Sequence, residues 1–83
     1  MKTEKIVTDD EKNVIGRNIR RFRISQNMLQ TEMIARLQLY QVSITREALV
    51  KIEGGRQHIK LSQLQGIKKV LGVSYDDLLE ERA

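Results

Sequence analysis

Four side chains at positions 46 to 51 carry the hydrogen-bonding and apolar groups that read DNA bases. Arg46 can donate two hydrogen bonds to a guanine edge, and Glu47 can accept one from a cytosine amino group. Lys51, about one and a half helical turns further on, can reach a base or a phosphate. Val50 can meet a thymine methyl group. These residues predict a surface that contacts the base edges of double-stranded DNA.

Each of these residues also has a purely structural interpretation. Arg46 and Glu47 could form a surface ion pair with each other or with neighbours, and such pairs contribute little to stability. Glu47 gains from the dipole at a helix N-terminus without any DNA. Val50 could lie at the edge of the core. The residue types alone leave both interpretations open.

The element that must position these side chains is a short helix expected over residues 46–54. Thr45 can cap its first turn, and Leu49 and Ile52, three residues apart, give it an apolar inner face. The glycine pair that follows is suited to a helix C-terminus. A short exposed helix of this kind, on a basic chain, is what a DNA major groove can accept.

Length and composition predict one small domain with an apolar core. The chain has 83 residues, 40% of them hydrophobic, no Cys, and a net charge of +4. It shows neither a signal peptide nor an apolar run of membrane-spanning length, so we expect a cytoplasmic location and no membrane partner. Basic residues gather in two segments and acids near the C-terminus, an asymmetry that can orient a protein toward a polyanion. The basic segments hold Arg17, Arg20, Arg21 and Arg23, then Arg46, Lys51, Arg56, His58 and Lys60.

The apolar spacing is helical nearly throughout, and no stretch alternates for long enough to build a sheet. We therefore expect an all-α fold, a compact bundle of about five short helices, with residues 1–8 as a flexible arm and 9–83 as a single domain. Thr8 to Glu11 has the spacing of a capping box for the first helix, which would run to about Ser25. The remaining helices are expected over about 30–38, 46–54 and 61–71, and after a Ser74 cap.

The sequence offers little for catalysis. It contains no Gly-rich phosphate loop, no metal-ligand cluster and no nucleophile beside a His. His58 is the only His, so neither a metal site nor a cofactor is expected. No apolar segment remains beyond the core to form a small-molecule pocket. We expect a binding protein and not an enzyme.

Residues 13 to 80 resemble the phage-repressor and Cro type of helix-turn-helix regulators, also called the xenobiotic-response-element family. The most specific part of the resemblance is Ile52-Glu53-x-Gly55, followed by a Leu-Gly-Val-Ser turn at 71–74. It implies a lambda-repressor-like DNA-binding domain and a sequence-specific transcriptional regulator, expected to be a repressor. Further shared residues are Ile19, Arg23, Gln30, Leu37, Thr45, Leu49, Arg56, Leu61, Leu64, Leu78 and Leu79.

The resemblance also implies roles for residues around the 46–54 helix, whose start would enter the major groove. Gln30 opens the preceding helix, where its amide and the free backbone N–H groups can bind a phosphate. Arg23 and Glu53 match a pair that the family uses as a structural salt bridge. The expected phosphate contacts are Gln30, Thr45, Arg56, Gln57 and His58.

The chain departs from the usual family pattern in three ways. The connection between the second and third helices is long, as in a long-turn branch of the family, and Leu39 and Ile44 are expected to tuck it onto the core. Ile34 stands where the family tends to place Ala. Leu29 and Lys60 occupy positions where a Ser or Thr would cap a helix, and a missing cap costs about 1 kcal/mol.

One such helix reads few base pairs, so a symmetric homodimer on a palindromic site, with half-sites about 34 Å apart, is expected. The dimer contact is expected to be weak and to come from the last helix, through Leu78 and Leu79. The alternative is a protein-interaction module on the same fold, such as an antitoxin or a regulatory partner subunit. Glu47 weakens the positive potential, and the long turn offers Tyr40 and Gln41 for a protein contact.

Overall fold

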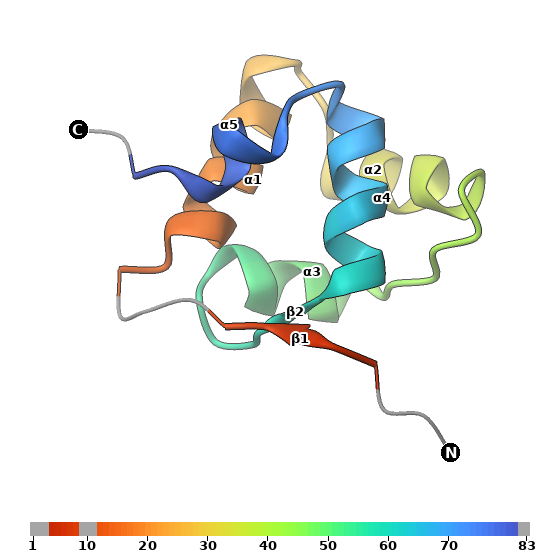
Figure 1. The fold of residues 1–83 in the computed structure, drawn as a ribbon. Helices are drawn as coiled ribbons and strands as arrows, with labels where there is room; N and C mark the ends of the chain where they lie inside the picture. Colours follow the sequence, from red (N-terminus) through yellow and green to blue (C-terminus); the bar gives the residue numbers. More distant parts are fainter. Residues whose placement is uncertain (1–3, 9–11, 82–83) are drawn as a thin grey trace.

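Five helices and two short strands follow one another in residues 4–8 and 12–81, which are the residues that the computed structural model describes (Figure 1). The all-α class and the predicted number of helices are confirmed, although a two-stranded sheet was not predicted. The helices are α1 (Val14–Ser25), α2 (Gln30–Gln38), α3 (Arg46–Glu53), α4 (Leu61–Leu71) and α5 (Tyr75–Leu79), and the strands are β1 (Ile6–Val7) and β2 (Ile59–Lys60).

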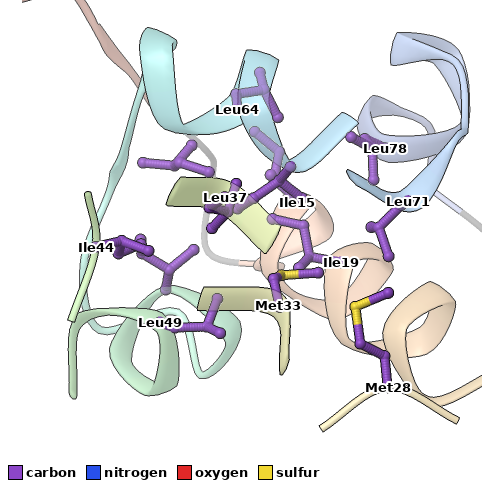
Figure 2. Close-up of a cluster of buried hydrophobic side chains, with 13 residues drawn as sticks. Ile15, Ile19, Met28, Met33, Leu37, Ile44, Leu49, Leu64, Leu71 and Leu78 are labelled. Carbon is purple, nitrogen blue, oxygen red and sulfur yellow. The ribbon is translucent and has the colours of Figure 1, made fainter. Parts of the chain in front are cut away.

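The helices enclose one core because each turns a single apolar face inward. α1 packs against α3 and α5, and α2 packs against α3 and α4 (Figure 1). The apolar positions recur every three or four residues, so they fall on one side of each helix. Figure 2 shows these side chains converging between the helices. The buried hydrophobic residues are Ile15, Ile19, Met28, Met33, Leu37, Ile44, Leu49, Ile52, Ile59, Leu64, Ile67, Leu71 and Leu78.

The first helix begins later than predicted. α1 starts at Val14, and its N-cap residue Asn13 has a left-handed backbone with φ 52°. The prediction of a capping box over Thr8 to Glu11 falls largely on residues 9–11, which lie outside the described residues. The expected end at Ser25 is confirmed, because the backbone N–H of Gln26 closes the last turn on the Phe22 and Arg23 carbonyls.

The segment expected to be a flexible arm contains strand β1 in its described part. Ile6 and Val7 pair antiparallel with Lys60 and Ile59 of β2. Just before this strand, the Glu4 carboxylate accepts a hydrogen bond of 2.8 Å from the backbone N–H of Ser62. Hydrogen bonds from Ser62 hold the pKa of the Glu4 carboxyl below its ordinary value. Glu4 therefore satisfies a free N–H group in the first turn of α4.

The helix starts divide into two kinds. Thr45 and Ser74 cap α3 and α5 with their own hydroxyl groups, as predicted. Leu29 and Lys60 have no oxygen to offer to α2 and α4. Instead, side chains three residues further on, Glu32 and Gln63, accept the backbone N–H of Leu29 and Lys60 at 3.3 and 2.9 Å. The missing caps are thus partly replaced from inside each helix.

The long turn between α2 and α3 is anchored differently from the prediction. Ile44 is buried as expected, but the prediction for Leu39 is wrong, because that side chain is 81% exposed. Val42 packs onto the core in its place and sits over Gly66 of α4. A Cβ at Gly66 would approach Val42 Cγ2 to 2.8 Å, so the absence of a side chain there makes room for the turn.

Helix α5 is held against α1 by both packing and hydrogen bonds. The Asn18 amide donates to the carbonyl oxygens of Leu78 and Glu80 at 3.0 and 2.8 Å. The Leu78 side chain has no exposed surface, so the predicted dimer contact through this residue is wrong. Leu79 is 45% exposed and Tyr75 lies nearby on the same helix, also exposed. In the described part of the chain, no helix has the length and apolar character to cross a membrane.

Candidate nucleic-acid interface

Helix α3 is anchored on one side and open on the other. Thr45 Oγ1 accepts a hydrogen bond of 3.0 Å from the Ala48 backbone N–H, which fixes the first turn. Leu49 and Ile52 are buried and hold the inner face against the core. Positions on the opposite face are therefore displayed outward by the helical repeat.

The structure brings the four predicted base-reading residues together. Arg46, Glu47, Val50 and Lys51 line one open hollow of about 360 Å³, and Arg56 completes its wall. We call this the α3 hollow. Its lining combines guanidinium, carboxylate, ammonium and apolar groups, which is the mixture of donors, acceptors and methyl contacts that base edges require.

Two of these side chains are paired with each other. Lys51 Nζ lies 3.1 Å from Glu47 Oε1, one helical turn away, and the two side chains are 42% and 78% exposed to solvent. An exposed pair at this spacing is worth only a few tenths of a kcal/mol. Glu47 therefore does form a surface ion pair, as its structural interpretation allows, but its partner is Lys51 and not Arg46.

The C-terminal end of α3 is fixed by a buried ion pair between Arg23 and Glu53. Arg23 Nε and Nη2 donate to the two carboxylate oxygens of Glu53 at 2.7 and 2.9 Å. Arg23 Nη1 also donates to the Met28 carbonyl at 2.8 Å. The two residues that the family resemblance pairs as a salt bridge therefore form one, with two parallel hydrogen bonds that fix its geometry.

Gln30 belongs partly to this same network. Its Nε2 donates to Glu53 Oε1 at 3.2 Å, so part of the amide is engaged by the buried pair. The pair thereby joins the start of α2 to the end of α3. Gln30 is half-buried, and it also lines a second hollow.

This second hollow, which we call the Arg20 hollow, lies between α1, α2 and the start of α3. Its volume is about 470 Å³, and Arg46 lines both hollows. Sequence reasoning did not single out Arg20 or Thr31 as site residues. A usable signal existed for Arg20, because it precedes Arg23 by three residues and so lies on the same face of α1. The lining residues are Arg20, Arg23, Leu29, Gln30, Thr31 and Arg46.

A close contact between α1 and α3 sets the position of α3, and sequence reasoning missed it. The Asn13 amide donates to the Glu53 carbonyl oxygen at 2.9 Å, at the C-terminal end of α3. A Cβ on Gly16 would collide with the Ile52 carbonyl oxygen. Gly55, with φ 76°, leaves the space that the Asn13 side chain occupies. These three residues allow the start of α1 to meet the end of α3.

The other predicted phosphate contacts are less closely grouped. The Thr45 hydroxyl serves as the α3 cap, although the residue is exposed. Gln57 and His58 are exposed between α3 and β2 and line neither hollow. Within the described residues, no group of three or more His, Asp or Glu side chains could hold a metal ion.

Comparison with known proteins finds one informative similarity. The chain is 27% identical over 74 residues to the control protein C.BamHI of Bacillus amyloliquefaciens, and the match covers 89% of this chain and 86% of that protein. No family model matches the chain, and no solved structure matches it. The chain is therefore similar, over most of the length of both proteins, to a protein that is named as a control protein.

Proposed function

We propose that this protein is a sequence-specific regulator of transcription, acting in the cytoplasm as a repressor, that binds double-stranded DNA through α3. The observation that carries the proposal is the α3 hollow, where five side chains suited to DNA gather on the open face of a firmly anchored helix. The similarity to a control protein agrees with a regulatory role and not an enzymatic one. Two-point anchoring of α3, at Thr45 and at Glu53, provides the rigidity that base recognition needs.

In this proposal each residue of the α3 hollow has a stated role. Arg46 donates to a guanine edge, Glu47 accepts from a cytosine amino group, and Val50 packs on a thymine methyl. Lys51 reaches a base or a phosphate once its weak pair with Glu47 opens. The backbone contacts that set the register would come from Gln30, Thr45, Arg56, Gln57 and His58.

The regulator would act as a weak homodimer on a palindromic site. α5 supplies the contact through Leu79 and Tyr75, which are the exposed large side chains of that helix. The small apolar area that they offer agrees with an association that DNA strengthens. Half-sites would then be about 34 Å apart, so that both copies of α3 reach the same face of the duplex.

The experiment that tests this proposal is selection from a pool of random duplex DNA, followed by sequencing, at two salt concentrations. We expect a palindromic motif, and we expect the Arg46→Ala and Lys51→Ala variants to lose enrichment of particular base positions. Binding should weaken as salt rises, because phosphate contacts release counterions. Failure to recover any motif, with no salt-dependent binding at low salt, would contradict the proposal.

A second candidate function is recognition of another protein by the same fold, as in an antitoxin or a regulatory subunit. The observation that favours it is the exposure of Leu39 and Tyr40 at the tip of the long turn. An apolar contact at this turn would be nearly insensitive to salt, unlike binding to phosphates. The salt dependence of complex formation therefore separates the two functions.

A further inference from the structure

We propose that the Arg20 hollow is a binding pocket for one backbone phosphate of duplex DNA, in which Arg20 of α1 is the principal ligand. The inference rests on the proposed function and deepens it, because it makes α1 a third DNA-contacting helix beside α2 and α3. None of the residues singled out from the sequence as contacts to DNA lies on α1.

The first step of the argument is the convergence of three helices on one concave surface. Arg20 comes from α1, Gln30 and Thr31 from α2, and Arg46 from α3. Side chains from separate elements meet at this point, so the hollow is a product of the packing and not of one helix end. The hollow of about 470 Å³ is open to solvent and wide enough to admit a phosphate group with part of its sugar.

The second step is the charge that remains in this hollow after internal pairing. Arg23 forms its back wall, but its guanidinium is buried and shared between Glu53 and the Met28 carbonyl. Arg20 and Arg46 are exposed, and their side chains form no ion pair or hydrogen bond with another side chain or carbonyl in the described part of the chain. No carboxylate lines the hollow. Two uncompensated guanidinium groups therefore face a space that only an anion would neutralise.

The third step is the chemistry of the remaining wall. The Thr31 hydroxyl and the part of the Gln30 amide not engaged by Glu53 add neutral donors beside the two cations. Guanidinium groups with neighbouring neutral donors are the set that phosphate oxygens prefer.

The fourth step is the position of the hollow relative to the proposed reading surface. Arg46 lines both hollows, so a backbone phosphate at Arg20 would lie next to the base edges met by α3. A helix seated in the major groove is flanked by the sugar-phosphate strands. A ligand at Arg20 thus fixes the docking angle of α3 by tying α1 to one flanking strand.

The test is a measurement of affinity for the selected duplex across a range of salt concentrations, for the wild type and Arg20→Ala. We expect Arg20→Ala to bind about tenfold more weakly at low salt and to reduce the slope of log affinity against log salt by about 1.8, which is about 0.9 for each of the two Arg20 side chains of the dimer. The loss should be equal on the selected duplex and on a scrambled one, because a phosphate carries no sequence information. Arg20→Lys should retain most of the slope, since an ammonium group can also meet a phosphate.

The matched control is Arg17→Ala, which removes the same charge from an exposed position one turn earlier on α1, outside the Arg20 hollow. It should leave the slope close to that of the wild type. A series of duplexes can each carry one neutral methylphosphonate, placed at successive positions of the backbone. The affinity of the wild type should fall when this group stands at one particular position in each half-site. The affinity of Arg20→Ala should not fall further when the methylphosphonate stands at that position.

The outcomes separate this inference from the proposed function. Suppose that the wild type selects a motif, but Arg20→Ala keeps the wild-type slope or loses no more affinity than Arg17→Ala does. The phosphate pocket is then wrong, and the regulator proposal stands. If the wild type binds no DNA, both are wrong. Circular dichroism shows whether each variant is folded, and Arg20→Gln, which also removes the charge, replaces Arg20→Ala if that variant is not folded.

Discussion

Two glutamates of α3 form ion pairs of opposite kinds at the two ends of the same helix. Glu53 is 5% exposed and meets Arg23 through two short hydrogen bonds, while Glu47 lies in solvent and meets Lys51 through one contact of 3.1 Å. A buried pair is costly to break from one side, because the remaining charge stays desolvated. An exposed pair exchanges easily with water. The same chemistry therefore fixes the helix at one end and leaves it available for binding at the other.

The largest expected effect comes from breaking the buried pair. Glu53→Ala should lower the free energy of unfolding by about 3–5 kcal/mol, because Arg23 is left buried without its carboxylate. Glu47→Ala should change it by less than about 0.5 kcal/mol. Urea unfolding followed by circular dichroism measures both. Equal losses for the two variants would contradict the distinction between the two ends of α3.

A smaller loss in the free energy of unfolding is expected when the contact between α1 and the C-terminal end of α3 is disturbed. Gly16→Ala places a Cβ against the Ile52 carbonyl oxygen and should lower the free energy of unfolding by about 1–3 kcal/mol. Gly72→Ala is the comparison, because no atom lies within 4 Å of a Cβ there and only the positive φ of 67° is unfavourable. That backbone cost is about 1 kcal/mol. Thermal unfolding in which Gly16→Ala is the milder of the two would rule out the proposed collision.

Removal of Lys51, the partner of Glu47 in the exposed pair, should lower the affinity for DNA but leave the free energy of unfolding almost unchanged. Lys51→Ala should change the free energy of unfolding by less than about 0.5 kcal/mol but weaken binding to the selected duplex about tenfold. The combined Glu47→Ala and Lys51→Ala variant gives the coupling between the two residues, expected to be about 0.3–0.5 kcal/mol in the free protein. A coupling several times larger would mean that the pair has a structural role.

The smallest expected effect concerns a third acid, Glu4, which is exposed but accepts the Ser62 backbone N–H at the start of α4. Its pKa is lowered in the folded protein, so the stabilisation is fully present above the unfolded pKa of about 4.3. It is lost as the pH falls through the lower, folded pKa. The difference in unfolding free energy between the wild type and Glu4→Ala should therefore be constant near neutral pH and vanish in acid. Urea titrations at several pH values measure it, and a difference that grows in acid would contradict this sign.

Local signals were sufficient for most of the helices. α2 and α4 lie where they were predicted, because their apolar periodicity is regular and Gly72 ends α4 with a left-handed backbone. Thr45 and Ser74 cap helices as their types predict. The start of α1 was placed too early, because the helix begins only after Asn13, whose backbone is left-handed and whose amide donates to the distant Glu53 carbonyl oxygen.

Other features depended on packing that no local pattern reveals. The choice of Val42 over Leu39 as the anchor of the long turn follows from the space above Gly66, on a helix more than twenty residues away. Leu78 and Leu79 are adjacent and chemically identical, yet one is fully buried and the other is not. The side that a short helix presents to the core is set by its neighbours, here α1 and the Asn18 amide.

The sequence by itself determined the helical class, the caps of α3 and α5 and the cluster of DNA-suited side chains at 46 to 51, because periodicity, capping and residue type act over a few neighbouring positions. Only the tertiary structure decided which charges are neutralised within the fold. Arg20 and Arg23 are three residues apart on α1, but Arg23 is buried against Glu53 while Arg20 opens onto a hollow shared with α2 and α3. Desolvation and pairing depend on neighbours in space, and those neighbours come from distant parts of the chain.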